Sequence, residues 1–318
     1  MRIHNIPKTS NNRSDIFTYK SSALYGLGKY KEALEAAEKA IEFNPQAAKA
    51  YSNKGSALGQ LGKFEESVAS CDKAIEIDAK IMEAYVSKAY SLNGLKRYDE
   101  AIEECKKAVE ISSGDDKLRT LAFSYMGIAQ EGKEEYEEAL MSFDKALEFK
   151  PEASYALTSI YTNKANVLID MHNYDEALEY SKKSIEIDPG NYEAYIYKSS
   201  ALLGLLKYDE VIACCDEVIE SKIEDYRIYT NKGLALRNKG KLGEALKAFD
   251  KSLELEPDNE IAKENRAGVS SKITGRKIGL FSGIIVLIVV ISVVAYMFFG
   301  KKKRKDLRLE DIYRGIDY

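Results

Sequence analysis

The sequence predicts an all-α protein in which seven helical hairpins stack on one another and one transmembrane helix follows them. Two observations lead to this fold class. A pattern of aromatic and small residues recurs seven times between residues 14 and 259, and the 22 residues from 278 to 299 carry no charge. Because one hairpin cannot bury its apolar face alone, hairpins that repeat in sequence are expected to stack.

The composition suits a helical chain and argues against a nucleic-acid-binding protein. Five prolines in 318 residues, with 45% hydrophobic and 31% charged residues, are typical of a helix-rich protein. The formal net charge of −4 differs from that of nucleic-acid-binding proteins, which usually carry a basic surface. Acidic and basic residues are interspersed along most of the chain, as they are on solvated helix faces.

One small residue in the second helix of each hairpin marks the period of the repeat. Successive copies are 34, 34, 38, 38, 34 and 34 residues apart. The seven copies are Ala33, Ser67, Ala101, Ala139, Ala177, Val211 and Ala245. Three residues before each copy stands a turn aromatic, replaced by leucine in the last repeat: Tyr30, Phe64, Tyr98, Tyr136, Tyr174, Tyr208 and Leu242.

Two further positions recur in the first helix. The aromatic position holds Phe17, Tyr51, Tyr85, Phe123, Tyr161, Tyr195 and Tyr229. Four residues later a small residue follows: Ser21, Gly55, Ala89, Gly127, Ala165, Ser199 and Gly233. Small residues let two helices approach closely, and aromatic rings fill the grooves between hairpins.

Together these positions resemble the tetratricopeptide repeat family, whose unit is a 34-residue helix–turn–helix. The resemblance covers residues 14–259 and implies an α-solenoid, a right-handed superhelix of helical hairpins. The resemblance sets the expected repeats at 14–47, 48–81, 82–115, 120–153, 158–191, 192–225 and 226–259. The other expected segments are a polar leader at 1–13, a capping helix and juxtamembrane segment at 260–277, a transmembrane helix at 278–299, and a basic tail at 300–318.

The two intervals of 38 residues each contain four additional residues. Four residues are close to one helical turn, so the flanking side chains keep their facing. We expect the additional turns at the start of the first helices of repeats four and five, near Asp116–Thr120 and Ala153–Ala156.

A lysine precedes the small residue of the first helix in six of the seven repeats, where the family commonly has leucine. The lysines are Lys20, Lys54, Lys88, Lys164, Lys198 and Lys232, and Met126 is the exception. This Lys-Gly variant resembles prokaryotic, particularly archaeal, arrays. Two interpretations are open: the aliphatic stems pack while the ammonium groups reach water, or the amines form a ladder that grips acidic partners.

The uncharged segment 278–299 is predicted to cross a membrane. As a helix it spans about 33 Å, against about 30 Å for a hydrocarbon core. Fifteen of its residues are Leu, Ile, Val or Phe. Arg276 and Lys277 precede it and Lys301–Lys305 follow it, which argues against a buried core helix.

The expected topology is a single pass through the cell membrane with the repeats in the cytoplasm. Lysine and arginine number five in the twenty residues before Ile278 and seven after Phe299, which does not decide the orientation. The polar start of the chain, without a secretory apolar run, favours the cytoplasmic side. Gly279 and Gly283 match a helix-pairing motif or occur by chance, and Lys301–Lys305 contact anionic lipid or simply end the span.

The sequence offers no candidate for catalysis, so we expect a protein that is not an enzyme and uses no metal, cofactor or small-molecule substrate. His4 lies in the leader and His172 in a repeat turn. Cys71, Cys105 and Cys215 share one repeat position in the second helix and are interpreted as small core residues. No phosphate-binding loop, nucleophile elbow or metal-ligand cluster is present in the sequence.

Binding of a protein or peptide partner remains. In the resembled family the first helices line a concave groove that holds extended or helical peptides. Carried over to this chain, the groove positions are Asn53, Asn163, Asn166, Asn231, Tyr19, Tyr125 and Tyr197. An amide can donate to and accept from a peptide backbone, and tyrosine offers flat contact area at low entropy cost. The alternative is that these polar residues are only solvated.

The sequence therefore predicts a membrane-anchored scaffold or adaptor that binds protein partners through its groove. The alternative from another class is a structural or assembly subunit of a membrane protein complex, with the convex face and the transmembrane helix as its contacts.

Overall fold

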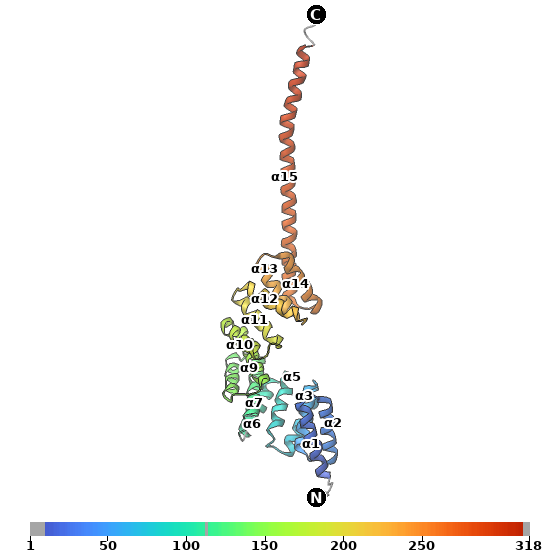
Figure 1. Cartoon of the computed structure of the whole chain (residues 1–318), viewed down its shortest axis with the longest axis vertical. Helices are drawn as coiled ribbons and strands as arrows, with labels where there is room; N and C mark the ends of the chain where they lie inside the picture. Colours follow the sequence, from blue (N-terminus) through green and yellow to red (C-terminus); the bar gives the residue numbers. More distant parts are fainter. Residues whose placement is uncertain (1–9, 112–113, 314–318) are drawn as a thin grey trace, which may run out of the picture. The chain divides into compact units, whose positions relative to one another are not determined.

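The computed structural model describes the backbone of residues 10–111 and 114–313, with side-chain surroundings for 12–111, 114–276, 278, 280, 282–295 and 297. Every regular element in these ranges is a helix (Figure 1). The fifteen described helices are α1 (Ser10–Gly26), α2 (Tyr30–Phe43), α3 (Ala48–Gln60), α4 (Phe64–Ile77), α5 (Met82–Gly94), α6 (Tyr98–Ile111), α7 (Asp116–Gly132), α8 (Tyr136–Glu148), α9 (Ser154–Asp170), α10 (Tyr174–Ile187), α11 (Tyr192–Gly204), α12 (Tyr208–Glu220), α13 (Tyr226–Asn238), α14 (Leu242–Leu255) and α15 (Glu260–Tyr313).

The chain divides into two compact units. The N-terminal unit ends at Lys207 and contains α1–α11, and the C-terminal unit begins at Tyr208 and contains α12–α15. The division falls between α11 and α12, the two helices that the sequence places in one repeat. Each unit is an all-α stack in which consecutive helices pack, and each is described by itself.

The additional turns lie where the 38-residue intervals predict them. α7 and α9 have 17 residues each, whereas α3, α5, α11 and α13 have 13. The carboxylate of Asp115 accepts a hydrogen bond of 3.0 Å from the backbone N–H of Leu118, which caps the start of the lengthened α7.

Within a hairpin, the small residue of the first helix makes room for a larger one in the second. A β-carbon on Gly127 would stand 2.7 Å from the ring of Phe143, which is fully buried. In the second hairpin the same place pairs Gly55 with Cys71, whose sulfur would lie 2.4 Å from such a β-carbon. The close helix packing expected from the small residues is therefore confirmed.

Between hairpins of the N-terminal unit, the turn aromatics fill grooves against glycines. A β-carbon on Gly94, Gly132 or Gly204 would stand 2.4–2.6 Å from the rings of Phe64, Tyr98 and Tyr174 respectively. Each ring begins a second helix, and each glycine ends the first helix of the following hairpin. The rings thus fix the spacing of neighbouring hairpins.

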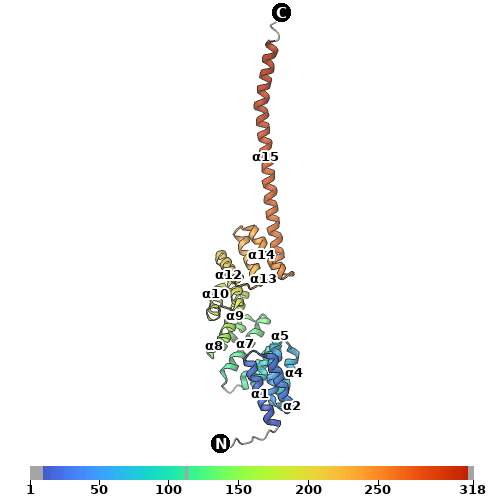
Figure 2. The same cartoon turned by 45° about the vertical axis from the view of Figure 1, so that its right-hand side comes forward.

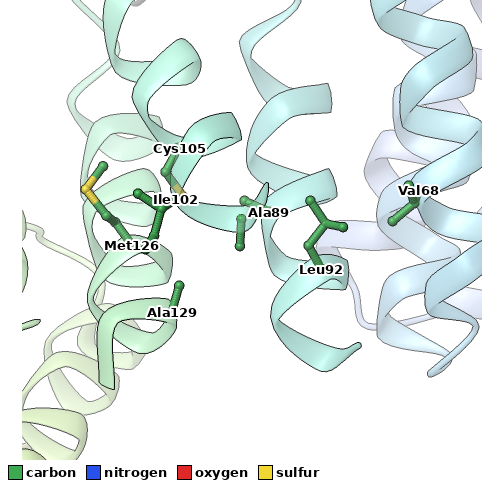
Figure 3. Close-up of a cluster of buried hydrophobic side chains, with 8 residues drawn as sticks. Val68, Ala89, Leu92, Ile102, Cys105, Met126 and Ala129 are labelled. Carbon is green, nitrogen blue, oxygen red and sulfur yellow. The ribbon is translucent and has the colours of Figure 1, made fainter. Parts of the chain in front are cut away.

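Within the N-terminal unit, neighbouring hairpins share apolar core clusters. Figure 3 shows one cluster to which α4 contributes Val68, α5 contributes Ala89 and Leu92, α6 contributes Ile102 and Cys105, and α7 contributes Met126 and Ala129. Four helices from three hairpins therefore share one core, as expected if no hairpin is stable alone.

The turns inside the hairpins contain one residue in the left-handed conformation. It is glycine in hairpins one, two and seven: Gly28, Gly62 and Gly240. In the four hairpins between them it is a residue with a side chain: Lys96, Glu134, His172 and Leu206. Glycine adopts this conformation without steric cost, whereas the other residues do not.

The C-terminal unit ends in one long helix, α15, which extends away from α13 and α14 in both views (Figures 1 and 2). Its first turns pack on the preceding hairpin, because Ala262, Val269 and Ile273 join the cluster built around Leu236 and Phe249. The helix then continues through the segment 278–299 to Tyr313 without a break.

The predicted membrane-spanning helix is not confirmed. Within the residues that the structure describes, no helix is long and apolar enough to cross a membrane. The large apolar side chains described between Ile284 and Val294 are exposed, at 42–62% of their surface. His4 lies outside the described residues, and the surroundings of Gly279 and of the Lys301–Lys305 side chains are not described.

Candidate functional site

The first two groove positions of the sequence lie in α1 and α3. Tyr19 is 72% exposed. Asn53 is half-buried, and its amide N–H₂ donates to the backbone carbonyl of Thr18 at 3.0 Å and to the hydroxyl of Ser22 at 2.9 Å. Asn53 therefore joins the first two hairpins, and its amide protons are engaged there.

Asn163 and Asn166 lie on α9, and both are half-buried. The amide of Asn166 donates to the carboxyl group of Glu131 on α7. Burial of this carboxyl raises its pKa to about 7, with Asp170 adding to the rise and the hydrogen bond from Asn166 opposing it. The pair thus brings a carboxyl group that titrates near neutrality to the ends of α7 and α9.

The other three predicted residues lie on three different helices. Tyr125 lies in the middle of α7, and Tyr197 is half-buried on α11. Asn231 is half-buried on α13 and belongs to the C-terminal unit.

Tyr125 belongs to a group of four tyrosines from alternate helices, which we call the tyrosine surface: Tyr25 of α1, Tyr90 of α5, Tyr125 of α7 and Tyr155 of α9. The rings of Tyr90 and Tyr125 lie 5.4 Å apart. Burial raises the pKa of Tyr125, and the hydroxyls of Tyr25, Tyr90 and Tyr155 are near enough to raise it further. Tyr25 also bonds the side chain of Gln60 on α3.

The members of the tyrosine surface all come from the first helices of hairpins in the N-terminal unit. Tyr25 belongs to the first hairpin and Tyr155 to the fifth, yet each affects the pKa of Tyr125 in the fourth. Tyrosines of hairpins one, four and five can approach one another only if the stack curves toward them. The first helices α1, α3, α5, α7 and α9 therefore line a shared inner face.

A cleft of about 420 Å³ adjoins this surface. Its walls come from the first turns of α7 and α9, which contain the inserted residues, and from the connection between α8 and α9. Its lining includes Asp116, Thr120, Leu121, Phe149, Pro151 and Tyr155. The ring of Phe149 stacks on Phe123 at 5.9 Å, and the Arg119 guanidinium lies 5.6 Å from its centre. Tyr155 is 60% exposed and lines both the cleft and the tyrosine surface.

Of these four tyrosines the sequence predicts only Tyr125 as a groove residue, and it predicts neither Tyr25, Tyr90 and Tyr155 nor the cleft. Tyr90 stands one helical turn beyond the groove position of its repeat, and Tyr155 stands inside the second insertion. The insertions were the available signal, because irregular turns that lie in adjacent hairpins can build a cavity that a regular repeat lacks.

The lysines of the Lys-Gly positions tie consecutive hairpins together. In four cases the ammonium contacts an Asp or Glu on the second helix of the preceding hairpin, and we call each contact a junction pair. The junction pairs are Lys54 with Glu38 at 3.0 Å, Lys88 with Asp72 at 2.7 Å, Lys164 with Asp144, and Lys232 with Asp216. These four amines bind acids of the chain itself, so they do not form a ladder for partners.

The environment of Lys164 is the most enclosed of these. Only 3% of the residue is exposed. Besides Asp144, its ammonium contacts Tyr180: it donates a hydrogen bond to the hydroxyl at 3.1 Å and lies 4.2 Å from the centre of the ring. The stem and the charge are therefore both packed, which goes beyond the interpretation of a lysine that reaches water.

The three cysteines at the shared repeat position are core residues, as the sequence predicts, and Cys214 is buried as well. Cys71, Cys105 and Cys215 are fully buried, and Cys214 is 3% exposed. All four are free thiols. Burial raises the pKa of Cys71 to about 12, and it raises that of Cys105 as well. Thiols with such pKa values carry little thiolate at neutral pH and are poor nucleophiles.

Solved structures share this fold at low sequence identity. One chain of the APC/C hetero-tetramer Cut9-Hcn1 superposes with a TM-score of 0.69 at 14% identity, covering 80% of this chain and 49% of that one, so this chain spans about half its length. A tetratricopeptide repeat protein from Parabacteroides merdae gives 0.57 at 18% identity, covering 81% and 99%. Pseudomonas aeruginosa pilF gives 0.52 at 15%, covering 82% and 100%. No curated protein matches the chain.

Sequence profiles agree with the fold and with the period of the repeat. Four profiles, each described as a tetratricopeptide repeat, match residues 20–81, 80–152, 158–191 and 226–259. The matches cover well over half of the chain and lie in register with its helical hairpins. The chain therefore belongs to the tetratricopeptide repeat family.

Proposed function

We propose that the protein is a scaffold that binds a protein partner on the concave side of its N-terminal unit and is anchored to a membrane by segment 278–299. The observation that carries the first part is the tyrosine surface with its adjoining cleft. Four tyrosines from four hairpins lie near one another, and one of them, Tyr155, also lines a cleft built by the first turns of α7 and α9 and by the α8–α9 connection.

The chemistry of this surface suits a peptide segment. Tyrosine buries apolar area while its hydroxyl still bonds backbone groups, and few rotamers are lost on binding. A cleft of about 420 Å³ has room for one large apolar side chain as an anchor. Phe149, Leu121 and Tyr155 provide apolar contact inside it, and Asp116 provides a polar group.

Segment 278–299 supports the proposed anchor through its sequence and the exposure of its side chains. Its 22 residues carry no charge, and the described apolar side chains from Ile284 to Val294 are exposed to solvent. Contiguous exposed apolar surface of this kind marks a membrane or protein interface. The proposal places the repeats in the cytoplasm, where the four free thiols suit a reducing compartment.

The second candidate is a structural or assembly subunit of a membrane protein complex. It is favoured by the same exposed apolar side chains, which then pack against another membrane protein instead of lipid. Purification of the full chain in mild detergent separates the two. A subunit retains a stoichiometric membrane partner after mutation of the tyrosine surface, whereas a scaffold loses its partner.

The test of the binding site uses proximity labelling in the native cell to identify partners, followed by capture with variants. We expect Tyr90→Ala/Tyr155→Ala to lose the partner. Tyr192→Ala is the matched control, because Tyr192 is an exposed tyrosine in the first turn of α11 and lies outside the tyrosine surface. Equal capture by the double variant and the wild type would refute this site.

A second variant tests the groove amides. Asn163→Ala/Asn166→Ala should weaken capture if Asn163 touches the partner. Because Asn166 already bonds Glu131, the single variant Asn166→Ala should alter stability more than binding. Undiminished capture by the double variant would show that these two amides do not contact the partner.

The anchor is tested with an epitope tag after Tyr318 in sealed vesicles. We expect the chain to stay in the membrane after carbonate extraction, and the tag to be protected when the protease digests the repeats. A chain released by carbonate would refute the anchor. Digestion of the tag with protection of the repeats would reverse the topology.

A further inference from the structure

The junction pairs follow a fixed register along the chain. In each of them the acid precedes the lysine by 16 residues, or by 20 residues where an inserted turn intervenes. Glu38 and Lys54, Asp72 and Lys88, and Asp216 and Lys232 show the first spacing, whereas Asp144 and Lys164 show the second. The register therefore identifies the two residues that face each other at every other junction.

Two junctions of the N-terminal unit carry a lysine at the acid position. Between α6 and α7 that lysine is Lys106, and the residue opposite it is Met126, which is 7% exposed and packed in the core. Because Met126 is uncharged, Lys106 has no second lysine opposite it at this junction. Between α10 and α11 the corresponding residues are Lys182 and Lys198, so two lysines share one junction.

Lys198 lacks the acid that its counterparts have. Lys198 is half-buried on α11, and its ammonium lies 5.6 Å from the centre of the Tyr195 ring. Within the described part of the chain, no carboxylate lies at ion-pair distance from Lys198 or Lys182. The adjacent Lys183 binds Glu179 at 2.6 Å, so that acid is already engaged. The register therefore puts two lysines at this junction, where four other junctions pair a lysine with an acid.

We propose that the α10–α11 junction is a binding site for the carboxylate of an Asp or Glu side chain in an acidic segment of a partner protein. This inference rests on the proposed function, because it adds a second contact for the same protein partner. The partner's carboxylate takes the place that Glu38, Asp72, Asp144 and Asp216 take at the other junctions, between the ammonium groups of Lys182 and Lys198.

A carboxylate fits the site because carboxylates occupy its counterparts. In the junction pairs the lysine ammonium lies beside an acid of the preceding second helix, at 3.0 Å for Lys54 and 2.7 Å for Lys88. At the α10–α11 junction the acid comes from outside the chain. The exposed Lys182 is accessible to it, and the half-buried Lys198 forms the inner contact.

The chain itself supplies the two variants that test the site. Lys198→Met reproduces the α6–α7 junction, and Lys182→Asp reproduces the α4–α5 junction by giving Lys198 an internal acid. Both variants should fold, because each uses a pair that the protein already contains. Each should also raise the midpoint of thermal unfolding, since each removes a repulsion between like charges.

The binding experiment titrates the full-length protein in detergent with a hexaglutamate peptide at low salt. We expect each variant to weaken peptide binding about threefold to fivefold, the usual effect of one partly exposed charge pair. Lys54→Met is the matched control, because Lys54 is engaged by Glu38. It should leave hexaglutamate binding unchanged and lower the unfolding midpoint. Wild-type affinity in both Lys198→Met and Lys182→Asp, or an equal loss in Lys54→Met, would overturn the site.

Two further measurements separate this inference from the proposed function and from other anions. Tyr90→Ala/Tyr155→Ala should leave hexaglutamate binding unchanged, so failure of the tyrosine surface and failure of this junction are distinguishable. Inorganic phosphate should compete only weakly with the peptide. Phosphate that binds more tightly than hexaglutamate, and does so only when both lysines are present, would overturn the assignment to a carboxylate.

Discussion

The regular hairpins α3–α4 and α5–α6 and the extended hairpins α7–α8 and α9–α10 follow the same repeat but differ in what they add to it. The regular hairpins have 13-residue first helices and cysteines packed on small residues. The extended hairpins have 17-residue first helices, a phenylalanine core in the first of them, a half-buried carboxyl group with a raised pKa, and a cleft. The shared positions build the stack, and the departures from them build the surface that can select a partner.

The largest effect expected from this difference is in the core. Phe143→Ala should lower the free energy of unfolding by about 3–5 kcal/mol, because it empties a fully buried ring position. Cys71→Ala, at the same repeat position of a regular hairpin, should cost much less because it removes one atom. Urea unfolding of both variants checks this. Equal losses would mean that the extended hairpin is no more dependent on its core than the regular one.

The next effect concerns pH. The pKa of Glu131 is raised from an ordinary 4.5 to about 7, so the folded state favours its protonated form. Its contribution to stability is present below pH 4.5 and is lost as the pH rises through 7. Glu131→Gln should therefore be more stable than the wild type at pH 8, by roughly 2–3 kcal/mol, and equal to it near pH 4.

The control for that prediction lies in a regular hairpin. Glu83 on α5 forms a solvent-exposed ion pair with Lys49 at 3.2 Å. Because exposed ion pairs contribute little, Glu83→Gln should change stability little at either pH. Thermal unfolding measured from pH 4 to pH 8 compares the two variants. If the unfolding midpoint of Glu131→Gln changed with pH as that of the wild type does, this carboxyl group would not be the source of the pH dependence.

A smaller effect is expected at the junction pairs. Lys164→Met should cost about 1.5–3 kcal/mol, because it removes hydrogen bonds from a charged group that is 3% exposed. Asp144 remains solvated after the change, which limits the loss. Lys54→Met should cost less than about 1 kcal/mol, because that pair lies closer to solvent. Denaturant unfolding in which Lys54→Met lost more than Lys164→Met would reverse this ranking.

The smallest effect separates two glycines. Gly127→Ala brings a β-carbon to 2.7 Å from the Phe143 ring and should cost about 1 kcal/mol net, after the gain in helix propensity is subtracted. Gly243→Ala meets no atom within 4 Å and should stabilise α14 by about 0.5–1 kcal/mol. Opposite signs in thermal unfolding are expected, and stabilisation by both would show that Phe143 can move aside.

The helices, the additional turns and the packing of aromatics on small residues could be predicted because they depend on neighbours at fixed spacing within one or two repeats. The tyrosine surface could not, because Tyr25 and Tyr155 approach through the curvature of the stack and not through any local pattern. For a related reason, partners could not be assigned to the lysines from the sequence. In sequence Asp72 resembles any exposed acid, and it meets Lys88 only because the second and third hairpins pack against each other.

The left-handed turn residues divide the hairpins into two kinds. Where glycine occupies this position, the turn is conformationally relaxed. At Lys96, Glu134, His172 and Leu206 the backbone carries a steric penalty of about 1–2 kcal/mol each. Single glycine substitutions at these four positions should therefore stabilise the middle hairpins, two of which, at Glu134 and His172, also form the cleft.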